Sequence, residues 1–124
     1  MKKLLIPVLF IGCLIIFPSQ SSALNLMESF FLKITVLEKD IEYQWEYTSP
    51  GKYEYEKGEK VIKTKEAKEE MAHILQILDL SEKANVENMV KALKEDRFPH
   101  LERLDIRWMT GEHKLYTWVW DAND

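Results

Sequence analysis

Cysteine, glycine and proline are scarce in this sequence, which contains one cysteine, four glycines and four prolines among 124 residues. A chain whose only cysteine is Cys13 cannot form an internal disulfide, so its fold must rest on a packed core. Aromatic residues are plentiful by contrast, with four tryptophans, five tyrosines and five phenylalanines. This balance is typical of a folded chain rather than a disordered one.

Long apolar runs are also missing. The longest, residues 4–17, is shorter than the ~20 residues that cross a bilayer. It follows two lysines and precedes the small residues Ser21 and Ala23, which is the pattern of a secretory signal with cleavage after Ala23. We therefore predict a signal peptide at 1–23 and one small domain at 24–124, secreted or otherwise extracytoplasmic.

Cys13 allows a second processing route. With Phe10 to Gly12 before it, the cysteine resembles a bacterial lipobox, in which a lipidated cysteine becomes the new N-terminus. However, Phe10 stands where leucine is preferred, and the apolar run continues after the cysteine, where a polar tether is usual. We interpret Cys13 as part of the signal and keep a cell-surface lipoprotein, lipidated at Cys13, as the alternative.

Positive charge is in short supply as well. Without residues 1–23, the chain keeps 15 basic and 21 acidic residues, a net charge of −6 with neutral histidines. Nucleic acids and anionic membranes attract proteins that have a basic face. The charge therefore argues against a nucleic-acid partner, and it restricts membrane attachment to an uncleaved signal or a lipidated Cys13.

Residues 24–40 are expected to form an N-terminal helix. Asn25 can cap it, Glu28 completes a capping box, and apolar residues follow at helical spacing. The competing interpretation is a strand over residues 33–37, because this segment contains three consecutive β-branched residues.

A β-hairpin follows, with apolar and polar residues alternating over 41–47 and 53–56 around a turn at 49–51. It is expected to extend through residues 61–62. A loop of two residues would place the aromatic side chains of the two strands on opposite faces. An odd-length loop or a bulge would gather them on one face, and we predict that arrangement, with Tyr47 opposite Tyr53.

Two helices are predicted after this hairpin. The first begins after Thr64 and runs to Leu78, with acidic residues in its first turns and an apolar stripe. The second begins at Ser81 or Asn85 and must end before Pro99. Their apolar stripes need a partner surface, so we expect both helices to pack on one face of the sheet.

The C-terminal part is predicted to be a second hairpin, with strands at 104–108 and 115–120. A two-residue loop at 111–112 would pair Trp108 with Leu115. A three-residue loop would instead gather the aromatics of both strands on one face. We favour the two-residue loop, because Gly-x suits a tight turn and because the last strand is apolar on both faces. Such a strand is usually interior to a sheet.

The predicted fold is therefore α+β: an N-terminal helix, a β-hairpin, two helices and a second β-hairpin. The two hairpins form an antiparallel sheet of about four strands, with the helices packed on one face.

Motifs for catalysis, cofactors and metals are absent from the sequence. No serine lies in a nucleophile elbow, no histidines form a zinc-binding pair, and no glycine-rich phosphate loop occurs. With 21 acidic residues some carboxylate pair always exists, so plentiful acids do not indicate hydrolysis. We expect a protein that is not an enzyme and needs no cofactor or metal. A small hydrolase with unidentified carboxylates is the alternative.

Aromatic residues on the predicted strands carry the clearest functional signal. They are Tyr43, Trp45, Tyr47, Tyr53, Tyr55, Trp108, Tyr116, Trp118 and Trp120. The simplest interpretation places them in the core. The functional one leaves some exposed on an acid-rimmed sheet face, with Trp45, Tyr116, Trp118 and Trp120 as candidate binding residues. The expected partner is an exported or cell-surface protein, and the alternative ligand is a cell-wall glycan.

Overall fold

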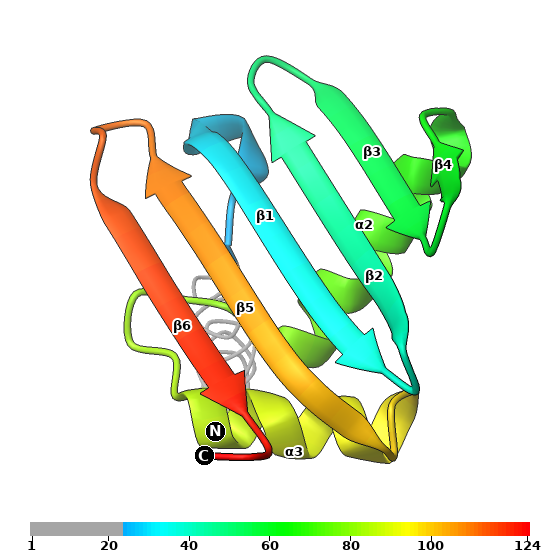
Figure 1. Cartoon of the computed structure of the whole chain (residues 1–124). Helices are drawn as coiled ribbons and strands as arrows, with labels where there is room; N and C mark the ends of the chain where they lie inside the picture. The colour runs from blue at the N-terminus through cyan, green and yellow to red at the C-terminus, as the bar shows by residue number, and fades with distance from the viewer. Residues whose placement is uncertain (1–23) are drawn as a thin grey trace, which may run out of the picture.

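A computed structural model describes residues 24–124 (Figure 1). The predicted signal peptide and Cys13 lie outside the described residues. The elements in chain order are η2 (Leu26–Glu28), β1 (Ser29–Glu38), β2 (Ile41–Thr48), β3 (Lys52–Lys57), β4 (Lys60–Ile62), α2 (Lys65–Leu78), α3 (Val86–Asp96), β5 (Leu101–Thr110) and β6 (Leu115–Asp121). The strands form one six-stranded antiparallel sheet in the order β4-β3-β2-β1-β5-β6, and both helices cover the same face (Figure 1). The α+β class is as predicted, but the sheet has six strands rather than about four.

The expected N-terminal helix is wrong. Asn25 does cap a helix, accepting a hydrogen bond from the Met27 backbone N–H at 3.0 Å, but that helix is the three-residue η2. Strand β1 follows at once and lies in the middle of the sheet, paired with β2 and with β5. Pairing on both sides satisfies the backbone of β1, and its β-branched residues suit a strand, so tertiary context outweighs the helical spacing.

The predicted register of the first hairpin is confirmed. Tyr47 lies opposite Tyr53 and Trp45 opposite Tyr55, across the three-residue loop 49–51. All four side chains point to the face covered by the helices, which we call the inner face. The extension of this hairpin is also present, as the short edge strand β4.

The favoured register of the second hairpin is wrong. Trp108 lies opposite Tyr116 rather than Leu115, so the aromatics of β5 and β6 share the inner face. The loop has three residues and ends at His113, whose φ of 67° is left-handed, as is common in three-residue hairpin loops. Gly111 is needed for another reason: a Cβ there would lie 2.6 Å from the Glu28 carbonyl oxygen, which accepts the Gly111 backbone N–H at 2.8 Å.

Both predicted helices are confirmed. The second begins after Asn85, not at Ser81, and the Asn85 side chain accepts a hydrogen bond from the backbone N–H of Asn88 at 3.2 Å. Helix α2 packs on β2 and β3, and helix α3 packs on β5 and β6. Residues between them, including Leu80, and after them, including Phe98, fill the remaining space in the core.

The inner face is built from cross-strand rows of apolar residues. The middle row runs Ile62, Tyr55, Trp45, Ile34, Ile106 and Trp118. Trp45, Ile34 and Ile106, near its centre, have no exposed surface. The simple interpretation of the aromatics as core is thus correct for the middle of the sheet. The expectation that the last strand is interior is wrong, because β6 forms an edge of the sheet.

Candidate functional site

The two edges of the sheet differ in how they are protected. Strand β4 has only three residues and lies between Lys57 and Lys63. Strand β6 has seven, and none from Leu115 to Trp120 is charged or proline. Short edge strands and lysines discourage the pairing of a sheet with other chains, whereas a long uncharged edge permits it. Among the described residues, the edge of β6 is therefore the better candidate for a site of strand pairing.

Backbone groups of β6 are divided between its two sides. The Lys114 carbonyl accepts the Thr110 N–H at 2.9 Å, and at the other end the Ala122 N–H donates to the Glu102 carbonyl at 2.9 Å. Hydrogen bonding alternates along an antiparallel pair, so even-numbered residues of β6 bond to β5. The N–H and C=O groups of the odd-numbered residues point away from the sheet; these are Leu115, Thr117, Val119 and Asp121.

Apolar side chains flank this edge on both faces. On the outer face, Leu115 and Val119 are 53% and 55% exposed. On the inner face, Tyr116, Trp118 and Trp120 are half-buried and pack against the margin of the core. The strand therefore offers free backbone groups between an aliphatic row and an aromatic row.

The aromatic row is held in place by contacts with the rest of the domain. The Trp118 indole N–H donates to the Ala84 carbonyl in the α2–α3 loop at 3.0 Å. Tyr116 stacks between Trp108 and Trp118, with ring centroids 5.2 and 6.1 Å apart. The Lys94 ammonium of α3 lies 5.2 Å from the centre of the Trp120 ring. These contacts fix the side chains before any partner arrives, which lowers the entropy lost on binding.

Trp45 lies far from the other three predicted binding residues. It is completely buried under helix α2, and its indole N–H donates to the Glu70 carboxylate at 3.4 Å. Arg97 donates to the same carboxylate at 3.1 Å. Burial lowers the pKa of Arg97, but the hydrogen bond and charge of Glu70 outweigh it and leave that pKa raised. Burial also raises the pKa of Tyr55, beside this pair. Trp45 thus belongs to the core that joins α2 to the end of α3.

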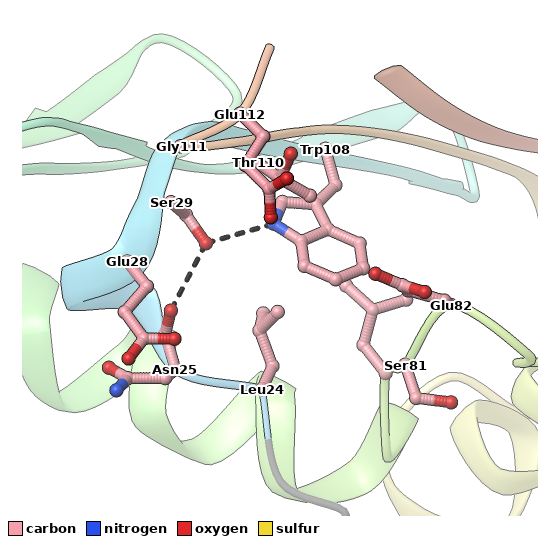
Figure 2. Close-up of a pocket in the computed structure, with 11 residues that line it drawn as sticks. Leu24, Asn25, Glu28, Ser29, Ser81, Glu82, Trp108, Thr110, Gly111 and Glu112 are labelled. Atoms are coloured by element: carbon pink, nitrogen blue, oxygen red, sulfur yellow. Dashed lines mark hydrogen bonds between the residues drawn. The ribbon is translucent and has the colours of Figure 1, made fainter. Parts of the chain in front are cut away.

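A pocket of about 500 Å³ opens where η2 meets the β5–β6 turn (Figure 2). Ser29 lies inside it, 4% exposed, and its hydroxyl donates to the Asn25 carbonyl at 3.2 Å while accepting the Trp108 indole N–H at 2.9 Å. Glu28, Glu82 and Glu112 also line the pocket, and no histidine does. Ser29 therefore ties η2 to β5, and its hydroxyl hydrogen is already donated to the Asn25 carbonyl.

Within residues 24–124, no three histidine, cysteine, aspartate or glutamate side chains converge into a group that could hold a metal ion. None of the helices between Leu24 and Asp124 has the length and apolar character needed to cross a membrane.

No protein-family model, no curated protein and no solved structure matches this chain. Interpretation of the site therefore depends on its geometry. The sequence pointed to Tyr116, Trp118 and Trp120, but it missed the free backbone edge that lies beside them. One signal was present: β6 is the last strand of the sequence and carries no charge until Asp121.

Proposed function

We propose that this protein is a non-enzymatic binding protein that takes up an extended segment of another exported or cell-surface protein along β6. The observation that carries the proposal is the contrast between the edges: β4 is short and bordered by lysines, whereas β6 is long and carries no charge from Leu115 to Trp120. Addition of a strand to a sheet edge is an established mode of peptide recognition, with backbone bonds providing affinity and alternate side chains providing specificity.

The edge also defines the chemistry of the partner. The backbone of the partner segment would bond to Leu115, Thr117 and Val119, whose N–H and C=O groups point outward. The side chains of this segment would alternate between the aliphatic row on one face and the tryptophans on the other. The best partner is therefore an extended segment with apolar residues on both faces and no charge in its middle.

A glycan ligand has less support. Sugars bind to the open faces of aromatic rings, whereas the Trp118 ring stacks on Tyr116 and its indole N–H is bonded to Ala84. Lys94 also lies against the ring of Trp120. The hydrolase alternative rests on unidentified carboxylates and gains no nucleophile from Ser29, whose hydroxyl takes part in structural hydrogen bonds.

The test is selection of random peptides, displayed on phage, against the folded protein. We expect selected peptides to show alternating apolar residues and to bind at least about tenfold more weakly to Thr117→Pro, which removes an outward N–H and adds a bulky ring at the edge. The matched control is Thr117→Val, which keeps the backbone donor and should bind like the wild type. Both variants are first checked for folding by circular dichroism and thermal unfolding.

A second arm uses the selected peptide with one backbone nitrogen methylated. Methylation at a nitrogen that bonds to β6 should abolish binding, whereas methylation at the neighbouring nitrogen should not. Equal binding to wild type and Thr117→Pro, or the absence of any peptide that depends on β6, would contradict the proposal. Binding of soluble cell-wall polysaccharide that is lost in Trp118→Ala but retained in Thr117→Pro would favour the glycan alternative.

A further inference from the structure

The outer face of the sheet, turned toward the viewer in Figure 1, has its charges sorted by strand. No helix of residues 24–124 covers this face, because α2 and α3 both pack on the inner one. Its acidic residues on β2 and β3 are Glu42, Glu46, Glu54 and Glu56. Its basic residues on the central strands β1 and β5 are Lys33, Arg103 and Arg107, with Asp105 as the one acid among them. Apart from Lys52 at the start of β3 and Asp121 at the end of β6, the face is thus acidic on β2 and β3 and mainly basic on β1 and β5.

One cross-strand row shows this division most clearly. Glu54, Glu46, Lys33 and Arg107 lie opposite one another in turn on β3, β2, β1 and β5. Two pairs of neighbours in this row are like-charged: Glu54 with Glu46 at one end, and Lys33 with Arg107 at the other. Like charges directly opposite on neighbouring strands destabilise a sheet, so a counter-charge from outside would be favourable.

Ion pairs within the chain provide only a weak counter-charge for these like-charged residues. Lys63 lies 3.9 Å from Glu54 and is 72% exposed, and Arg107 lies 3.6 Å from Asp105 and is 61% exposed. Pairs this exposed contribute little. The acidic half is also under electrostatic strain at Glu56: partial burial and then the neighbouring carboxyl of Glu54 raise its pKa, and Glu46 raises it further.

We propose that the occupant of this face is a second copy of the chain, packed sheet against sheet about a two-fold axis that runs parallel to the strands between β1 and β2. This axis exchanges β2 with β1 and β3 with β5. It therefore places Glu54 of one copy over Arg107 of the other, and Glu46 over Lys33. The row is acidic–acidic–basic–basic, so it complements its own reversed copy at all four positions.

The next row is compatible with this packing at most of its positions. On the next row, Gln44 meets Thr35, and Val61 at one edge meets Val119 at the other, both of them exposed and apolar. Glu56 meets Asp105, which is the one like-charged contact. It is tempered by Arg107, which lies 3.6 Å from Asp105.

The area is sufficient for a weak dimer. The four strands that face one another, β3, β2, β1 and β5, lie about 4.8 Å apart, are about eight residues long and present about 500 Å². Two such faces bury about 1,000 Å², which is at the low end for a specific interface. Because the contacts are charged and near solvent, the dimer should weaken as the ionic strength rises. The interface shares Val119 with the aliphatic row of the proposed peptide site, but it leaves the backbone edge of β6 open, so this inference does not depend on the proposed function.

The test measures the dimer dissociation constant by analytical ultracentrifugation at low salt. Glu54→Arg and Arg107→Glu alone should each raise it at least about tenfold, because each brings like charges together across the axis. The double variant should restore it to within about threefold. Within one copy the two residues are about 14 Å apart across β2 and β1, too far for a direct ion pair, so recovery reports on contact between copies.

Matched controls are Glu87→Arg and Lys91→Glu, which make the same charge changes on the exposed side of α3 and should leave the dissociation constant unchanged. A protein that stays monomeric at the highest concentrations reached, or a dimer indifferent to both reversals, would overturn the inference. A dimer abolished by Thr117→Pro but not by the reversals would be an edge-to-edge dimer through β6 and would overturn it equally.

Discussion

At the scale of single residues, Gly111 fixes where the β5–β6 turn lies against η2. The Glu28 carbonyl approaches it so closely that a side chain would have to push the β5–β6 turn away from η2. The left-handed His113 completes the loop of three residues. The position of this turn thus depends on a contact with a residue at the other end of the domain.

Gly111→Ala should therefore destabilise the protein by about 2 kcal/mol, through the clash with Glu28 and the loss of the hydrogen bond to its carbonyl. The free energy of unfolding in urea measures this. Gly51→Ala is the control, since a Cβ there meets no atom within 4 Å. It should change stability by less than about 1 kcal/mol. Similar losses in the two variants would show that the contact with Glu28 does not matter.

Residue types alone could not separate the four aromatic candidates for binding. Trp45 and Trp118 are both tryptophans on strands and both point to the inner face. Trp45 is buried and Trp118 half-exposed only because β2 lies inside the sheet and β6 at its edge. The exposure of each tryptophan therefore depends on the order of the strands in the sheet. The alternation of side chains along a strand does not reveal that order.

At the scale of elements, both faces of the final strand contribute to the proposed site, but its two sets of backbone groups have different functions. Even-numbered residues of β6 bond to β5, and odd-numbered residues face outward. Proline cannot donate a hydrogen bond, so its effect depends on which set it enters.

Proline at Val119 should consequently be tolerated, with a loss of stability below about 1 kcal/mol. Proline at Trp118 should cost about 3 kcal/mol or more, because it removes a bond to β5 as well as a packed indole. Trp118→Ala separates these two losses, since it removes only the indole. Thermal and urea unfolding of the three variants provide the measurement, and equal damage at Val119 and Trp118 would mean that the assigned alternation is wrong.

Some helices and strands could be predicted from their own residues alone, and others could not. The first hairpin and both helices follow from local signals, namely strict alternation, a turn-forming triplet and capping residues. The secondary structure of β1 was predicted wrongly because its residues give two conflicting signals. Leu32, Ile34 and Val36 alternate as in a strand, while the wider spacing of apolar residues around them fits a helix. Strand β1 pairs with β2 on one side and with β5 on the other, and β5 begins only at Leu101, far from β1 in the sequence.

At the scale of the whole molecule, the division of charge across the sheet should make stability depend on pH. Partial burial and the neighbouring Glu54 raise the pKa of Glu56 above its usual 4.5. A carboxyl of this kind binds its proton more tightly in the folded state. It therefore favours folding at low pH, and this contribution is lost as the pH rises from 4.5 through the folded-state pKa.

Glu56→Gln removes that titration. The stability of the variant relative to the wild type should increase as the pH rises above about 4.5 and then level off. Urea unfolding from about pH 3.5 to pH 7, at protein concentrations where the chain is monomeric, would show the effect. A constant difference across this range would indicate that Glu56 titrates alike in the folded and unfolded chains.

Strand order has a further consequence for how the chain folds. The central strand β1 needs β5 as a neighbour, and β5 begins only at Leu101. Pairing segments so distant in sequence is slow. Until β5 docks, the sheet ends at β1, whose apolar edge can capture strands of other unfolded chains. Truncation before Leu101 should therefore yield an aggregating fragment rather than a smaller soluble domain, because residues from Leu101 onward are needed to close the sheet against misassembly.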